Sequence, residues 1–195
     1  IAIYADDNKG VALNEITITN THKITVSGNR GVGIAIRDSI NSGSGGVVNV
    51  TGAGSSDIVT GTNGVGIYAE NSEVKLNSNY GIETKEGGVG IYAAKSSIPT
   101  ASTLEYKYSG STSGRGMAIV YTKANTTNST NIKLVNSTGT IGGLIGIFAN
   151  GGGTFTNNGT ITGSSTAKEF AIIGENSNIV NNAAITLGNA SSITT

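Results

Sequence analysis

The segment Gly64-Val-Gly-Ile-Tyr-Ala69 decides the fold, because the chain repeats it. It returns as Gly88-Val-Gly-Ile-Tyr-Ala93 and, one copy earlier, occurs as Gly31-Val-Gly-Ile-Ala-Ile36. Weaker copies keep an isoleucine inside a short apolar run. The shared isoleucines of the seven copies are Ile3, Ile34, Ile67, Ile91, Ile119, Ile147 and Ile172. The steps between them range from 24 to 33 residues, which is typical of a solenoid with fixed strands and variable loops.

Two further apolar runs separate successive copies, and many of them show the two-residue period of a strand. We assign to the first run Ile16/Ile18, Val48/Val50, Val74/Leu76, Leu104/Tyr106, Ile132/Leu134, Phe155 and Ile179. We assign to the second Ile24/Val26, Ile58/Val59, Ile82, Ile141, Ile161 and Ile185/Leu187. The sequence therefore predicts an all-β fold, a right-handed parallel β-helix of about seven coils with three strands each and negligible α-helix. Residues 1–195 are expected to form one continuous segment of a larger protein.

Alternation within a strand sorts the side chains of each coil. In the quoted segment it predicts Val65, Ile67 and Ala69 inside, with Gly66 and Tyr68 outside. Lys75, Glu105 and Lys133 are expected at one outward position of successive coils, where their charges would alternate. Asparagines follow the first run and predict an inward amide ladder at the corner; they are Asn20, Asn77/Asn79, Asn136, Asn157/Asn158 and Asn181/Asn182.

The composition excludes several classes of site. The chain has no cysteine, so it has no disulfide framework, thiolate metal site or cysteine nucleophile. Its formal net charge is +0, which gives no electrostatic reason to expect nucleic acid or an anionic membrane as a partner. No metal site and no cofactor are predicted.

Paired carboxylates are the first requirement of a polysaccharide-cleaving β-helix enzyme. Asp7 and Asp38 are the one acidic pair that the register brings together, with Arg37 beside them. We interpret this group as a solvated loop of mixed charge and keep catalysis or calcium binding as the alternative. The single histidine, His22, has no partner at a catalytic spacing and is expected to be a solvated loop residue.

The outward position beside each shared isoleucine carries the most distinctive surface row. It reads Tyr4, Ala35, Tyr68, Tyr92, Val120, Phe148 and Ile173. Stacked one strand apart, these residues would form a partly aromatic stripe, and exposed apolar stripes mark contact surfaces. Tyr4, Tyr68, Tyr92 and Phe148 are therefore the candidate partner-binding residues. The alternative is that the aromatic rings brace the stack.

The Gly-Val-Gly-Ile-Tyr-Ala repeat, together with Asn158-Gly-Thr-Ile161 and Ile24-Thr-Val26, resembles the passenger region of large outer-membrane autotransporters, the type V secreted adhesins. Similar glycine-rich repeats occur in pectinase-like enzymes, filamentous haemagglutinins and phage tailspikes. The resemblance implies a stalk on the bacterial cell surface, anchored at the outer membrane or secreted, with the membrane barrel domain outside this chain.

These observations together predict a function without catalysis. The chain is expected to be a structural and adhesive segment of a surface adhesin, with a protein or glycan receptor on host or bacterial cells as its partner. The alternative is a β-helix carbohydrate-active enzyme, either a polysaccharide lyase or a hydrolase.

Overall fold

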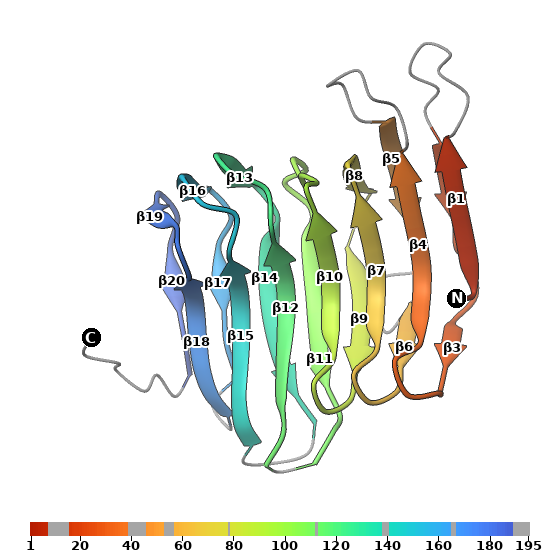
Figure 1. The fold of residues 1–195 in the computed structure, drawn as a ribbon. Coiled ribbons are helices and arrows are strands. Elements are labelled where there is room, and N and C mark those ends of the chain that lie inside the picture. The colour runs from red at the N-terminus through yellow and green to blue at the C-terminus, as the bar shows by residue number, and fades with distance from the viewer. Residues whose placement is uncertain are drawn as a thin grey trace.

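The computed structural model describes residues 1–7, 16–38, 46–52, 57–77, 79–111, 113–137, 141–164 and 167–188. Within these ranges the chain forms twenty strands and no helix. The strands wind as a right-handed parallel β-helix, with the N-terminal coil at one end of the stack and the C-terminal coil at the other (Figure 1). The predicted fold class is confirmed.

Two seven-stranded sheets run the length of the stack. Sheet A contains β1 (Ile3–Asp7), β4 (Val32–Asp38), β7 (Val65–Glu70), β10 (Val89–Ala94), β12 (Arg115–Tyr121), β15 (Ile141–Ala149) and β18 (Ala167–Gly174). Sheet C contains β3 (Ile24–Val26), β6 (Ile58–Thr60), β9 (Tyr80–Thr84), β11 (Thr103–Tyr108), β14 (Asn131–Asn136), β17 (Ile161–Thr162) and β20 (Ile185–Thr186). Five strands of each sheet are therefore paired on both edges.

The third wall consists of two short sheets. Sheet B contains β2 (Ile16–Thr19), β5 (Gly46–Thr51) and β8 (Ser72–Asn77), and sheet D contains β13 (Thr126–Asn128), β16 (Thr154–Asn157) and β19 (Asn178–Asn181). Between them the chain passes through Ser97 and Ile98, which make single-residue bridges to Glu73 and Asn128. Among the described residues, the coil that begins at β10 thus has two strands, and the other coils have three.

Register in sheet A follows the shared isoleucines without exception. Each of the seven lies beside the next, from Ile3 and Ile34 at the first step to Ile147 and Ile172 at the last. Those from Ile34 to Ile147 are fully buried. Stacking identical β-branched side chains one strand apart fills the space behind the sheet at each level and fixes the register of the coils.

The glycine inside the repeat lies inward, contrary to the prediction. A Cβ added to Gly66 would lie 2.5 Å from Cγ2 of Ile82 in β9, and one added to Gly33 would lie 2.5 Å from Cγ2 of Ile58 in β6. Both contacts cross the interior from sheet A to sheet C. Strict alternation fails at this position, and only glycine fits there because the two sheets approach too closely for any side chain.

Four tyrosines, Tyr80, Tyr106, Tyr108 and Tyr121, are fully buried in the middle of the stack. Most of their hydroxyl groups have a hydrogen-bond partner. The hydroxyl oxygen of Tyr106 lies 2.6 Å from Oγ1 of Thr84, and the hydroxyl group of Tyr121 donates to Oδ1 of Asn128 at 3.0 Å. Burial raises the pKa of Tyr80, Tyr106 and Tyr121 well above 10, because each phenolate would lose its hydration.

The assignment of the intermediate runs was wrong in two coils. Tyr106 pairs with Ile82, and Ile132 pairs with Ile161, so β11 and β14 belong to sheet C. Ile141 lies in β15 of sheet A. The first run of these coils is instead the segment Ser97–Ile98 in one coil and β13 in the next, and neither has the alternating apolar pair.

The charge ladder changes with that assignment. Glu105 and Lys133 are neighbours in sheet C, and their carboxylate and ammonium groups lie 2.9 Å apart. Lys75 is in sheet B beside Asn49 and does not join them. Of the three residues predicted to form a charge ladder, only Glu105 and Lys133 are therefore neighbours.

The amide ladder is confirmed at Asn157 and Asn181, and it extends to Asn128, which was not predicted. Asn136, predicted for that coil, lies in β14 of sheet C instead. Asn128 donates to Oδ1 of Asn157, and Asn157 donates to Oδ1 of Asn181, each at 2.8 Å. The second hydrogen of each amide group binds the carbonyl two residues further along the chain. Asn20 is also buried and donates to the carbonyl of Asp57, whereas Asn77 and Asn79 are exposed.

Candidate functional site

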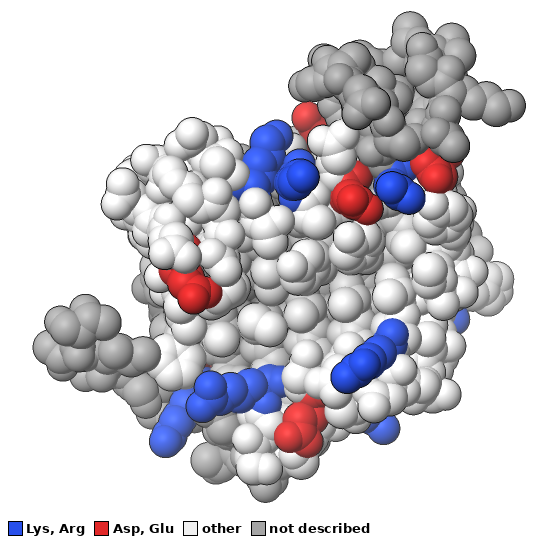
Figure 2. All heavy atoms as spheres, in the orientation of Figure 1, with Lys and Arg blue, Asp and Glu red and all other residues white. Residues whose placement is uncertain are grey.

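The predicted outward row exists as a row of neighbours on sheet A. Tyr4 pairs with Ala35, Ala35 with Tyr68, and the register continues through Tyr92, Val120 and Phe148 to Ile173. Figure 2 shows this face, on which charged side chains lie mainly along the upper and lower borders and uncharged residues fill the middle. The row thus crosses every coil on one side of the molecule.

Tyr68 and Tyr92 form a stacked pair in the middle of this row. Their ring centroids are 5.8 Å apart and the ring planes differ by 14°. Both side chains are half-buried. Because the rings face each other along the axis of the stack, they present their edges and hydroxyl groups to solvent. Burial, followed by the nearby Glu70 carboxylate, raises the pKa of Tyr68 above its usual value.

The small residues on either side of the pair are covered. Ala35 and Val120 are each only 5% exposed although they lie on the outer face. Larger side chains on the adjacent coils therefore screen them from water. Around the tyrosine pair, the residues of the row therefore pack against one another and form a continuous apolar surface rather than a series of separate rings.

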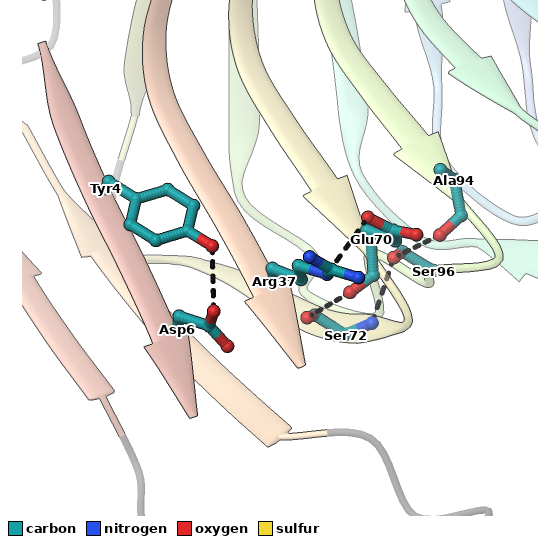
Figure 3. Close-up of polar contacts among 7 residues, drawn as sticks. All are labelled: Tyr4, Asp6, Arg37, Glu70, Ser72, Ala94 and Ser96. Atoms are coloured by element: carbon teal, nitrogen blue, oxygen red, sulfur yellow. Dashed lines mark hydrogen bonds and ion pairs between the residues drawn. The ribbon is translucent and has the colours of Figure 1, made fainter. Parts of the chain in front are cut away.

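The other two predicted aromatic residues lie apart from the pair. Tyr4 is 56% exposed, and its hydroxyl group donates a 2.8 Å hydrogen bond to Oδ2 of Asp6 (Figure 3). Phe148 is half-buried and separated from Tyr92 by Val120. The structure brings together two of the four candidate residues.

A charged border runs beside the row where the strands of sheet A end. Asp6, Arg37 and Glu70 occupy one column of the register. Nε of Arg37 lies 3.6 Å from Oε2 of Glu70, with both side chains partly exposed (Figure 3). Exposed ion pairs of this kind contribute about 0 to 1 kcal/mol, so this border adds polarity to the face more than stability.

The corner after this border is built by serine side chains. The N–H of Ser72 donates to Oγ of Ser96 at 2.9 Å, while each serine hydroxyl donates to the carbonyl two residues before it, at Glu70 and Ala94 (Figure 3). Asn71 and Lys95 turn the chain between strand and serine with φ angles of 50° and 51°. These contacts fix the position of the border relative to the aromatic pair.

The candidate acidic pair is confirmed as a pair in the backbone register only. Asp7 lies beside Asp38 at the ends of β1 and β4, while their side chains are outside the described residues. Over the described part of the chain, no group of three or more His, Asp or Glu side chains lies close enough to hold a metal ion. His22 is exposed, and its Nδ1 lies 3.0 Å from Oγ1 of the adjacent Thr21.

Two buried carboxyl groups were not predicted. Asp57 is 3% exposed, and its Oδ2 accepts a hydrogen bond from the backbone N–H of Gly81. Glu169 of β18 is 1% exposed and pairs with Leu144, at a position where earlier copies carry glycine. It accepts hydrogen bonds from the backbone N–H groups of Ser164 and Gly188. Burial nevertheless raises its pKa. A hollow of about 340 Å³ adjoins it in the last coil, lined mainly by aliphatic residues such as Ile172, Ile179 and Ile185.

The signal for Glu169 was present in the sequence. It stands three residues before the shared isoleucine, in a column otherwise occupied by Gly31, Gly64, Gly88, Gly116 and Leu144. An acidic residue in an apolar column indicates a buried carboxylate that needs backbone donors.

None of the described segments is a helix of the length and apolarity that crossing a membrane requires. No family model, no curated protein and no solved structure matches the chain.

Proposed function

We propose that this chain is a non-enzymatic segment of a bacterial surface adhesin of the autotransporter type. The β-helix supplies length, at about 4.8 Å per coil, and the outer face of sheet A supplies a contact surface for a receptor on host or partner cells. The protein would be anchored at the outer membrane or secreted.

The observation that carries the proposal is the Tyr68–Tyr92 pair. The rings are stacked 5.8 Å apart and half-buried in an uncharged row, with polar groups along the border (Figure 2). Aromatic side chains that expose a hydroxyl group beside apolar surface are enriched in binding interfaces. A protein or glycan receptor could bury the exposed ring edges and bind both hydroxyl groups.

Adhesion of the double variant Tyr68→Ser/Tyr92→Ser tests the contact surface. We expect the purified variant to lose binding to epithelial cell layers and to partner bacteria that the wild-type chain binds. The matched control is Tyr4→Ser, on the same row but outside the pair, which should bind as the wild type does. Undiminished adhesion of the double variant would contradict the proposal. Lost adhesion together with a large drop in melting temperature would favour the bracing role instead.

A separate experiment tests whether the chain lacks enzymatic activity. The chain is incubated with acidic polysaccharides, with and without calcium, and released sugars are measured. We expect no release. Turnover that disappears in Asp7→Asn or Asp38→Asn would show that the chain is a carbohydrate-active enzyme.

A further inference from the structure

Tyr68 and Tyr92 differ from the other tyrosines of the chain because their rings lie close to each other and are also partly exposed to solvent. Tyr4 is exposed, and its hydroxyl group is bound to Asp6. Tyr80, Tyr106, Tyr108 and Tyr121 are fully buried. The stacked pair alone brings two phenol rings together, nearly parallel, where a small molecule can reach them from solvent.

We propose that Tyr68 and Tyr92 form a site of oxidative cross-linking, at which a peroxide-driven one-electron oxidant joins the two rings as dityrosine. Each phenol loses one electron and its hydroxyl proton, which leaves a phenoxyl radical with spin density on the carbon ortho to oxygen. The two ortho carbons then form a carbon–carbon bond. Each ring recovers its aromaticity when the ortho hydrogen moves to oxygen. The protein loses two hydrogen atoms in total, and one hydrogen peroxide accepts them and becomes two waters.

The geometry favours coupling within one chain over coupling between chains. Tyr68 and Tyr92 are direct neighbours in the register of β7 and β10, so the backbone holds the rings side by side before any radical forms. Holding two reactants in this way replaces a bimolecular encounter by an intramolecular one, which raises the effective concentration by orders of magnitude. Rotation of the two side chains out of the stack must then bring the ortho carbons into contact.

The position of the pair gives the cross-link a structural consequence. β7 leads into β8, the last strand of sheet B, while β10 leads into Ser97 and Ile98, where the third wall is reduced to single bridges. A bond between Tyr68 and Tyr92 would tie these two coils together at a step where the third wall is reduced to a single bridge. Like a disulfide, it would also restrict the unfolded chain. We therefore expect the oxidised protein to melt at a higher temperature.

Treatment of the chain with a haem peroxidase and hydrogen peroxide tests the proposal. Digestion of the treated chain with trypsin yields the peptide of residues 38–75, which contains Tyr68, and the peptide of residues 86–95, which contains Tyr92. Neither peptide contains another tyrosine. We expect the monomer fraction to show dityrosine fluorescence and a joined species of these two peptides that has lost two hydrogen atoms.

Phenylalanine variants provide the controls, because they keep the stacked ring and remove only the reacting hydroxyl group. Tyr68→Phe and Tyr92→Phe should each lose the joined species, while Tyr4→Phe should retain it. A wild-type monomer without the joined peptides, under conditions that couple free tyrosine, would overturn the proposal. Joined peptides containing Tyr4 at equal yield would also overturn it, since they would show coupling without regard to the stack.

Discussion

Gly66 and Ile82 face each other across the interior of the β-helix, and a Cβ on Gly66 would lie 2.5 Å from Cγ2 of Ile82. The same Cβ would lie 2.6 Å from the carbonyl oxygen of Gly90 in the next coil. Cβ contacts under 3.0 Å essentially never occur in proteins. The glycine that makes the repeat recognisable is therefore required by the close approach of sheets A and C.

Replacing Gly66 with alanine should destabilise the chain by about 1 to 3 kcal/mol, the usual cost of adding a methyl group to a filled core. The carbonyl of Gly90 cannot rotate away, because it belongs to the backbone of β10. Urea unfolding measures the change. Gly28→Ala is the control, since no atom lies within 4 Å of its added Cβ. Equal stability of the two variants would contradict the close packing.

Truncating the stacked isoleucines should cost more than removing a surface charge. Ile67→Ala leaves a cavity in a fully buried column and should lower the free energy of unfolding by about 2 to 5 kcal/mol. Lys75→Ala removes an ammonium group that lies 3.8 Å from the Glu73 carboxylate on the surface, which should cost about 0 to 1 kcal/mol. Thermal unfolding of both variants provides the comparison, and similar losses would mean that inside and outside are misassigned.

Hydrophobic periodicity predicted those parts of the fold in which every coil buries the same side chain. The shared isoleucines gave the register of sheet A correctly from Ile3 to Ile172. Periodicity failed where the chain forms the wall with polar residues: Ser97 and β13 carry no alternating apolar pair. In those two coils the prediction assigned Leu104 and Ile132 to the first run after the shared isoleucine, whereas they lie in the second, in β11 and β14 of sheet C.

A different signal would have located that wall. Asn128, Asn157 and Asn181 each stand four residues before an isoleucine of sheet C, at Ile132, Ile161 and Ile185. The outward row could be predicted because alternation fixes which side chains are neighbours. The ring orientation of Tyr68 and Tyr92 could not, since side-chain rotamers depend on the residues packed beside them.

The middle amide of the ladder should be the most sensitive to substitution. Asn157 is fully buried, donates to Gly159 and Asn181, and accepts from Asn128. Asn157→Ala leaves these polar groups without partners, and each one that water cannot reach costs about 1 to 3 kcal/mol. Asn182→Ala is the matched control, because that side chain makes one exposed bond to Asn158. Urea unfolding should show a change of about 0.5 kcal/mol or less for the control. A comparable change for Asn157→Ala would show that the ladder does not stabilise the fold.

The buried tyrosines should make the fold sensitive to alkali. The pKa of Tyr106 and that of Tyr121 are raised above the ordinary value of 10 by burial, so above pH 10 the unfolded chain binds fewer protons than the folded chain. Stability is therefore fully present below pH 10 and falls as the pH rises toward the folded values. Each such tyrosine contributes up to about 1.4 kcal/mol per pH unit to this slope. Urea unfolding at a series of pH values on either side of 10 measures it.

Tyr121→Phe isolates the contribution of one phenol group. Its hydroxyl group donates to Oδ1 of Asn128, which also accepts the N–H of Thr130, so the amide keeps a donor when the hydroxyl is removed. The variant should show a shallower decline above pH 10, by up to about 1.4 kcal/mol per pH unit, while groups common to both proteins cancel in the difference. Ultraviolet absorbance should show phenolate appearing together with unfolding in the wild type. Identical slopes for the two proteins would mean that Tyr121 ionises in the folded chain as readily as in the unfolded one, and would contradict its burial.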